Sequence, residues 1–186
     1  MMRAKRSDAT RNRDRILTVA VEVFTADGLD ASMDSIARSA GVGNATLYRH
    51  FPSREALIMA AYEHEVDVLA GSAEGLLKTD APLEAMRRWM WQYIDYVATK
   101  RGMAEVLRHV ASGQDDFFNP TREKLLEAMR TLLDAGMTAG AFRTDVNAKQ
   151  LFQVTTAVCL ASDDSEWKEH SRKIMAVFLD GLVLRP

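Results

Sequence analysis

The sequence predicts an all-α protein with two parts: a small N-terminal domain built around two short helices, and a larger helical body behind it. Apolar residues recur at intervals of three and four through most of the chain, which is typical of amphipathic helices. No segment alternates with period two for long, and the 186 residues include only four prolines, so β-structure is not expected. The stretch 32–51 reads as two helices that a tight turn joins.

Composition indicates an ordinary soluble globular protein, with 47% hydrophobic and 27% charged residues. The net charge of −2 is unevenly spread: residues 1–60 carry nine Lys/Arg against seven Asp/Glu, and residues 61–186 carry fifteen against nineteen. A basic start on an acidic protein fits an end that faces nucleic acid, although a solvated basic tail is the commoner source of such a run.

No apolar run reaches the roughly 18–20 residues of a membrane span. With Cys159 as the single cysteine, we expect a cytoplasmic protein without an intrachain disulfide.

Residues 1–28 are predicted to form an arm and then a helix. Residues 1–10 lack apolar periodicity and are expected to form a flexible basic arm. A helix is predicted from near Asn12 to Ala26, ended by Gly28, and its buried side is formed by Ile16, Leu17, Ala20, Val23 and Phe24.

The stretch 32–51 divides its residues between burial and exposure. Ser32 is expected to cap a helix whose apolar stripe is Met33, Ile36, Ala37 and Ala40. Gly41 should end that helix in the left-handed conformation. A second helix from Asn44 carries the apolar residues Ala45, Leu47 and Phe51, and its other side chains are polar or have a polar tip. This division is what a helix-turn-helix requires.

Further helices are predicted along the rest of the chain. Pro52 breaks the chain and Ser53 caps a helix that should run to about Ala70, followed by a turn or loop over 71–82. Body helices are expected over 83–100, 103–111, 121–139, 148–161 and 166–184. A loop over 114–120 and a turn over 140–145 separate them, and either Asn147 or Asp145 caps the helix that follows the turn.

The residues Ala-Gly-Val-Gly-Asn-Ala-Thr-Leu-Tyr-Arg-His-Phe at 40–51, followed by Pro-Ser-Arg-Glu-Ala-Leu at 52–57, resemble the signature of tetracycline-repressor-like (TetR) transcriptional regulators. The resemblance covers about the first third of the chain, from roughly Arg11 to Met59. It implies a three-helix helix-turn-helix DNA-binding domain over 11–56 and a helical regulatory and dimerisation domain over 57–186. The implied function is a dimeric, ligand-responsive repressor whose two recognition helices lie roughly one DNA turn, about 34–36 Å, apart on a near-palindromic operator.

The resemblance also implies which residues contact double-stranded DNA. Thr46, Tyr48 and His50 should donate to phosphates, with Arg54 at the place of the family's usual lysine clamp. The Ser32 hydroxyl is expected to contact the DNA backbone. Arg49 is expected to contact a base, a phosphate or neither. Gly43, Asn44 and Ala45 are expected nearest the base edges, and among them Asn44 is the best base reader because its amide pairs bidentately with adenine.

Two residues depart from the family pattern. Asp34 would repel phosphate unless it accepts from a cytosine amine or caps a helix, and Gly43 replaces a more usual serine, which weakens the helix cap. These departures mean that the operator sequence does not carry over from relatives. The basic arm enters a minor groove or makes no contact; both outcomes stay open.

The body residues support two further expectations that rest on the resemblance. An apolar effector ligand would lie in a pocket among Tyr62, Met86, Trp89, Met90, Tyr93, Met103, Leu107, Phe117, Met129 and Leu133, although plain core packing is the favoured explanation for each residue taken singly. A homodimer interface on the last two helices would use Leu151, Val154, Val158, Trp167, Ile174, Phe178 and Leu182.

No catalytic or metal motif is present in the sequence. Glu63, His64 and Asp67 share one helical turn but lack a second cluster, which favours a solvated face over a metal site. The alternatives to the repressor are an activator, an all-α enzyme or small-molecule-binding protein that uses a body cavity, and an interaction protein with a relic helix-turn-helix. No cofactor, catalytic residue or membrane partner is expected.

Overall fold

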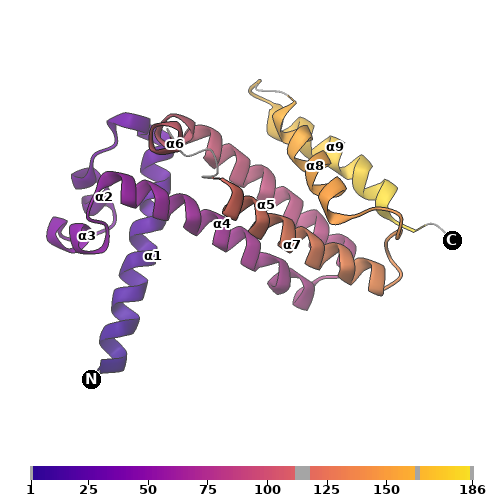
Figure 1. Ribbon diagram of the computed structural model, residues 1–186, viewed down its shortest axis with the longest axis horizontal. Helices are drawn as coiled ribbons and strands as arrows, with labels where there is room; N and C mark the ends of the chain where they lie inside the picture. Colours follow the sequence, from indigo (N-terminus) through magenta and orange to yellow (C-terminus); the bar gives the residue numbers. More distant parts are fainter. Residues whose placement is uncertain (1, 112–117, 162–163, 185–186) are drawn as a thin grey trace. The chain divides into compact units, whose positions relative to one another are not determined.

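The computed structural model describes residues 2–111, 118–161 and 164–184, and within those ranges the chain is helical without a β-strand (Figure 1). This confirms the all-α prediction. The elements are α1 Met2–Asp27, the 3₁₀ turn η1 Gly28–Asp30, α2 Met33–Ser39, α3 Asn44–His50, α4 Arg54–Thr79, α5 Pro82–Gly102, α6 Ala104–Ala111, α7 Asn119–Thr138, α8 Ala148–Leu160 and α9 Trp167–Leu182.

The chain divides into two compact units. The first comprises residues 1–65 and 99–117, and the second comprises 66–98 and 118–186, so that α4 and α5 each contribute to both. The first unit therefore takes in α6, which the sequence analysis assigned to the body. The reason is close packing of α6 and the end of α5 on the first helices: α6 contacts η1, and a Cβ on Gly102 would lie 2.5 Å from Cγ2 of Thr25.

The first unit has its own core. α1 contributes Ile16, Leu17, Ala20 and Phe24, and α2, α3 and α4 add Ile36, Leu47, Leu57 and Ile58, all essentially inaccessible to solvent. Phe24 and Phe51 are both buried in this unit, as the sequence predicts. This core fixes α2 and α3 on the supporting helix α1.

The second unit is built from residues 66–79 of α4 and 82–98 of α5 together with α7, α8 and α9. Within it, α8 packs against both α7 and α9 (Figure 1). Its centre is an aromatic cluster. Trp89 donates from its indole N–H to the carbonyl of Leu69 at 2.9 Å, and its ring stacks on Tyr93 at 5.8 Å between centroids. Tyr93 meets Phe152 edge-on at 5.5 Å, and its hydroxyl lies 2.9 Å from the hydroxyl of Thr156. The polar ends of these buried rings are thus hydrogen-bonded.

The turn between α7 and α8 also follows the prediction. Gly140 adopts φ +68°, a left-handed conformation that ends α7. Asn147, rather than Asp145, caps α8: its side chain accepts from the backbone N–H of Gln150 at 3.0 Å. Phe142 and Val183 then form an isolated antiparallel bridge that ties this turn to the end of α9.

Two helix boundaries differ from the sequence prediction. The loop expected at 71–82 is mostly helix, since α4 continues to Thr79. Gly71 and Gly75 weaken a helix by about 1 kcal/mol each, but Ala73 and Leu76 lie buried on the same segment, and burial outweighs that cost.

At the other end, α1 begins at Met2 rather than near Asn12, so the segment expected as an arm is helical. Residues 2–10 contain no glycine or proline, and a helix already formed by its packed part extends at little cost. The Phe117 part of the loop expected at 114–120 falls outside the described residues, and α7 begins at Asn119 with Pro120 in its first turn.

In the part of the chain that the structure describes, no helix combines the length and the apolar character that crossing a membrane requires.

Candidate nucleic-acid interface

The start of α2 is held by a reciprocal cap. The Ser32 hydroxyl accepts from the backbone N–H of Ser35 at 3.0 Å, and the Ser35 hydroxyl accepts from the N–H of Ser32 at 3.3 Å. Ser35 takes the position that Glu or Gln occupies in the common form of this motif. Ser32 is exposed, as a backbone contact to DNA would require, and its cap confirms the predicted helix start.

The turn between α2 and α3 has a fixed geometry. Gly41 adopts φ +63°, and Val42 donates its backbone N–H to the carbonyl of Ala37 at 3.0 Å, which closes α2. Gly43 then caps α3 with its backbone alone: no side-chain hydrogen bond is made there, as its missing hydroxyl predicts. A side chain other than glycine at 41 would be strained, so this turn sets the angle between the two helices.

α3 presents one buried anchor and a broad exposed face. Leu47 is fully buried, whereas Asn44, Ala45, Tyr48 and Arg49 are exposed, Tyr48 to 47%. Thr46 and His50 are half-buried at the edges of this face, and the Thr46 hydroxyl accepts from the Arg49 guanidinium at 3.3 Å. The exposed face therefore contains most of the residues that the sequence assigned to DNA.

Asp34 has a specific partner on this face. Nδ2 of Asn44 donates to Oδ1 of Asp34 at 2.7 Å, so the first turn of α2 is joined to the first turn of α3 by a charge-assisted hydrogen bond. The sequence analysis left the role of Asp34 open between a helix cap and a cytosine contact. In the free protein it accepts from the residue that the sequence favoured as base reader.

Arg54 makes internal contacts. Its guanidinium donates to the carbonyl oxygens of Gly28 at 3.2 Å and Leu29 at 2.9 Å, and also to that of Ala31. Its Cζ lies 5.2 Å from the ring centroid of Phe24, within the range of a cation–π contact. The half-buried side chain thus fastens α4 to η1 and α1, and its phosphate contact remains a prediction.

The N-terminus of α4 is capped as predicted. The Ser53 hydroxyl accepts from the backbone N–H of Ala56 at 3.1 Å. Hydrogen bonds from its own backbone N–H and from Ser53 lower the pKa of Glu55, with His109 and Arg54 as smaller contributions. A stable negative charge at a helix N-terminus fits the helix dipole.

Arg13 is a residue of this region that sequence reasoning did not assign individually. Its guanidinium lies over the ring of Phe51, 5.5 Å from the centroid, which places an exposed cation of α1 beside the end of α3. The charge of Arg13 is plain in the sequence, but Phe51 lies far along the chain and its contact with Arg13 could not be inferred from spacing.

The residues predicted for a dimer interface separate into two groups. Leu151 and Leu182 are buried within the second unit, so they belong to its core. Val154, Val158 and Trp167 are half-buried, and Ile174 and Phe178 are 42% and 44% exposed. Two further apolar residues of α8 and α9 are exposed, Leu160 at 63% and Val177 at 71%. The burial of Leu151 and Leu182 was not readable from the sequence, because periodicity marks the apolar side of a helix without saying which neighbour covers it. The dimer interface stays a prediction.

The residues predicted to line a ligand pocket are deeply buried where the structure describes them. In the first unit these are Tyr62, Met103 and Leu107, and in the second unit Met86, Trp89, Met90, Tyr93, Met129 and Leu133. Phe117 lies outside the described residues. Each unit therefore uses its share of them as core, and the effector pocket stays a prediction.

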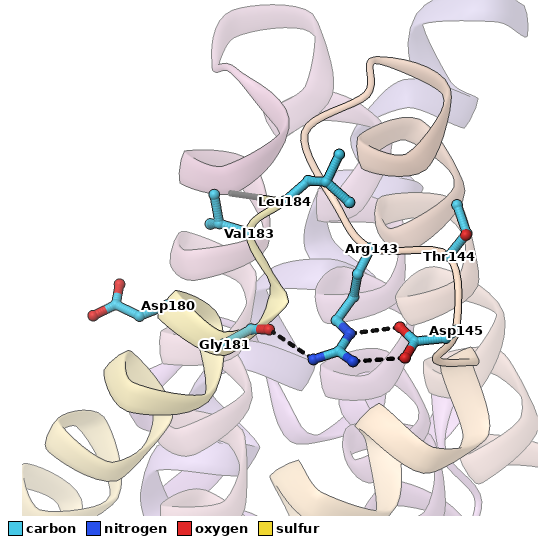
Figure 2. A pocket seen from close by; sticks show the side chains of 7 residues that line it. All are labelled: Arg143, Thr144, Asp145, Asp180, Gly181, Val183 and Leu184. Atoms are coloured by element: carbon cyan, nitrogen blue, oxygen red, sulfur yellow. Dashed lines mark hydrogen bonds and ion pairs between the residues drawn. The ribbon is translucent and has the colours of Figure 1, made fainter. Parts of the chain in front are cut away.

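A surface pocket of the second unit lies elsewhere, between the α7–α8 turn and the end of α9 (Figure 2). The Arg143 guanidinium donates to both carboxylate oxygens of Asp145, at 2.5 and 2.6 Å, and to the carbonyl of Gly181 at 3.4 Å. The hydrogen bonds between this pair lower the pKa of Asp145 and raise that of Arg143. A guanidinium matched in this way by its own chain is poorly suited to bind an anionic ligand.

Within the described ranges, no three His, Cys, Asp or Glu side chains form a group that could hold a metal ion.

Comparison with known proteins agrees with this geometry. Residues 16–61 match the family described as bacterial regulatory proteins of the tetR family, and residues 81–184 match the family described as transcriptional regulator SbtR-like, C-terminal domain. The TetR transcriptional regulator SCO0520 from Streptomyces coelicolor is 41% identical with a TM-score of 0.86, covering 94% of this chain and 99% of that one. A TetR transcription regulatory protein from Mycobacterium vanbaalenii is 34% identical with a TM-score of 0.79, covering 96% and 99%. The HTH-type transcriptional repressor KstR2 of Rhodococcus jostii is 27% identical over 154 residues, covering 79% of this chain and 76% of that protein.

Both parts of the chain thus match TetR-type domains, and the similarity to SCO0520 extends over nearly the whole length of each protein. The capped α2, the Gly41 turn and the exposed face of α3 supply the helix-turn-helix that such domains use to bind DNA. The protein belongs to the TetR family of DNA-binding transcriptional regulators.

Proposed function

We propose that this protein is a ligand-responsive repressor that binds a near-palindromic operator as a two-fold dimer. The observation that carries the proposal is the recognition helix α3, which exposes Asn44, Tyr48 and Arg49 around the buried anchor Leu47. A helix held by its apolar side on a rigid core, with an amide, a phenol and a guanidinium facing outward, has the chemistry to contact base edges and phosphates in a major groove.

An exposed apolar stripe on α9 supports the dimer. Val177 and Phe178 stand three and four residues after Ile174, and the three side chains are 42–71% exposed, with Leu160 of α8 also exposed. The two helices pack side by side, so each dimer half would offer two helices to its mate (Figure 1). Exposed apolar side chains that gather on one helix are typical of an interface.

The proposal includes repression under the control of an effector. The similarity to a protein named as a repressor supports repression over activation, because a dimer that covers promoter DNA blocks transcription by occupancy. The methionines and aromatic residues of the body are adaptable side chains that can line a pocket for a small apolar ligand. α4, like α5, contributes residues to both units, and it directly follows the recognition helix in the chain, so it is the connection through which a ligand would change the spacing of the recognition helices.

The test is selection of bound sequences from random duplex DNA by the purified full-length protein, repeated at several salt concentrations. We expect an inverted repeat whose affinity falls steeply with salt, because several phosphate contacts release counterions. Tyr48→Phe should weaken binding about tenfold with an unchanged unfolding midpoint, since only one exposed hydroxyl is removed.

Two results would contradict the proposal. Turnover of a substrate without salt-dependent DNA affinity would indicate an all-α enzyme. The absence of a selected DNA motif would indicate an interaction protein. Because a protein purified with its effector also fails to select DNA, mass spectrometry of the extracted protein accompanies the selection and distinguishes that case.

The dimer has its own test. Val177→Glu places a charge in the exposed stripe and is expected to convert the dimer to a monomer in analytical ultracentrifugation, with loss of binding to the inverted repeat. Val68→Glu is the matched control, because Val68 is 59% exposed on α4 of the same unit, away from the α9 stripe in sequence. A dimer that persists in Val177→Glu would argue against this interface.

A further inference from the structure

The contact between Asp34 and Asn44 restricts the amide that is best placed to read a base. The two side chains come from the first turns of α2 and α3, their atoms lie 2.7 Å apart, and both residues are exposed. Asn44 shares its face of α3 with the exposed Tyr48, which follows it by four residues. The hydrogen bond therefore lies within the surface that would meet DNA.

The chemistry of the pair fixes which end of the amide points where. An ionised carboxylate only accepts hydrogen bonds, so Asp34 can be joined by the NH₂ end of Asn44 and not by its carbonyl. A 180° rotation of the amide would bring two oxygens together at this distance. A free asparagine on a surface interconverts between the two orientations, whereas this one is held in a single orientation.

One donation to Asp34 leaves Asn44 with one N–H and its carbonyl oxygen. These are the two groups that a bidentate contact with adenine uses, the carbonyl accepting from N6 and the N–H donating to N7. Guanine presents two acceptors on the same edge, O6 and N7, and a carbonyl that cannot rotate away would face O6. An amide that is free to turn could instead offer its NH₂ end to guanine.

We propose that Asp34 is a specificity-determining positioning residue: by holding the Asn44 amide in one orientation, it makes each recognition helix prefer adenine over guanine at one base pair. This inference rests on the proposed function, since it requires α3 to lie against base edges. It also explains why a carboxylate is present on a DNA-facing surface, where its charge alone opposes binding.

A role for Asp34 in the helix alone gives a different expectation. A carboxylate in the first turn of α2 is favoured by the helix dipole, and its removal would cost a little stability but no base preference. A purely electrostatic role predicts that its removal raises affinity for every sequence by the same factor. Only the positioning role links Asp34 to the one base pair that Asn44 reads.

The experiment begins with selection from random duplexes by the full-length protein and by Asn44→Ala, which identifies the base pair whose preference Asn44 provides. Affinity is then measured for two duplexes that differ only there, adenine against guanine, with each variant. We expect Asp34→Ala to lose about tenfold of this discrimination, the lower range of what a bidentate amide–adenine contact contributes, while preferences at other positions persist. The double variant Asp34→Ala/Asn44→Ala should discriminate no worse than Asn44→Ala.

Two matched variants separate the fixed orientation of Asn44 from hydrogen bonding alone and from charge. Asp34→Asn replaces a carboxylate that only accepts by an amide that also donates, so Asn44 can join it in either orientation, and the preference should fall about as far as in Asp34→Ala. Asp30→Ala removes an exposed carboxylate of η1 in the same unit and should leave the preference unchanged. Unfolding midpoints of all variants, measured without DNA, show that each protein is folded.

Several results would overturn the inference. Unchanged discrimination in Asp34→Ala, with affinity raised equally for both duplexes, would leave Asp34 as a mere surface charge. Loss of preference at another base pair would make Asp34 itself the reader. An inverted repeat selected equally by wild type and Asn44→Ala would remove Asn44 as reader while the proposed function stands, whereas a wild type that selects no motif overturns both.

Discussion

Gly136→Ala is expected to destabilise the protein by about 3 kcal/mol, although alanine is the better helix former by about 1 kcal/mol. A Cβ on Gly136 would lie 1.9 Å from Cδ2 and 2.1 Å from Cε2 of Phe142. The ring is 1% exposed, and backbone hydrogen bonds hold its residue: Phe142 donates to the carbonyl of Gly136 at 3.2 Å, and Arg143 donates to that of Leu182 at 3.0 Å. The ring therefore cannot move aside without giving up its burial.

Urea unfolding of full-length variants measures this effect. Gly75→Ala is the control, because the position is also helical but a Cβ there would enter open space; it should gain up to about 1 kcal/mol. Adding Phe142→Leu to Gly136→Ala should cost less than the sum of the two single changes, because the clash and the ring are removed together. A Gly136→Ala protein as stable as wild type would show that the close approach of Phe142 is unimportant.

Arg54→Lys is expected to lower stability by about 2 kcal/mol while keeping the charge. The guanidinium donates to the carbonyls of Gly28, Leu29 and Ala31 at once, and the compact ammonium of lysine cannot reproduce that planar fork or its stacking on Phe24. DNA affinity should fall as well, because the loosened η1 adjoins the start of α2.

This substitution distinguishes an internal clamp from a phosphate contact. A residue that only meets phosphate would tolerate lysine, which the family commonly has there, and both the unfolding midpoint and DNA affinity would stay near wild type. Arg38→Lys, on an exposed face of α2, is the control and should change neither quantity. An unchanged midpoint in Arg54→Lys would return this side chain to the predicted phosphate role.

Local sequence determined the helix-turn-helix and the capping of its neighbours. Ser32, Gly41 and Ser53 act within a few residues of their own positions, through one hydrogen bond or one backbone conformation, so their roles follow from residue type and spacing. Leu47 is buried and Tyr48 exposed for a similarly local reason, the 100° rotation between consecutive helical residues.

Tertiary packing decided the features that depend on what lies opposite. α4 continues through Gly71 and Gly75 because burial of Ala73 and Leu76 outweighs the local preference for a turn. The apolar sides of α8 and α9 were readable, but Leu151 and Leu182 turned inward while Val177 stayed exposed, since periodicity does not identify the neighbour.

The same reason separates the site residues. Asp34 and Asn44 are ten positions apart, and Arg54 is 23 or more from the carbonyls that it binds; their partners come into reach only when α2, α3 and η1 are packed on α1. The sequence by itself determined that this chain presents a recognition helix to DNA. The tertiary structure decided which side chains of that surface are held in place by others, because hydrogen bonds between distant residues depend on packing rather than on spacing along the chain.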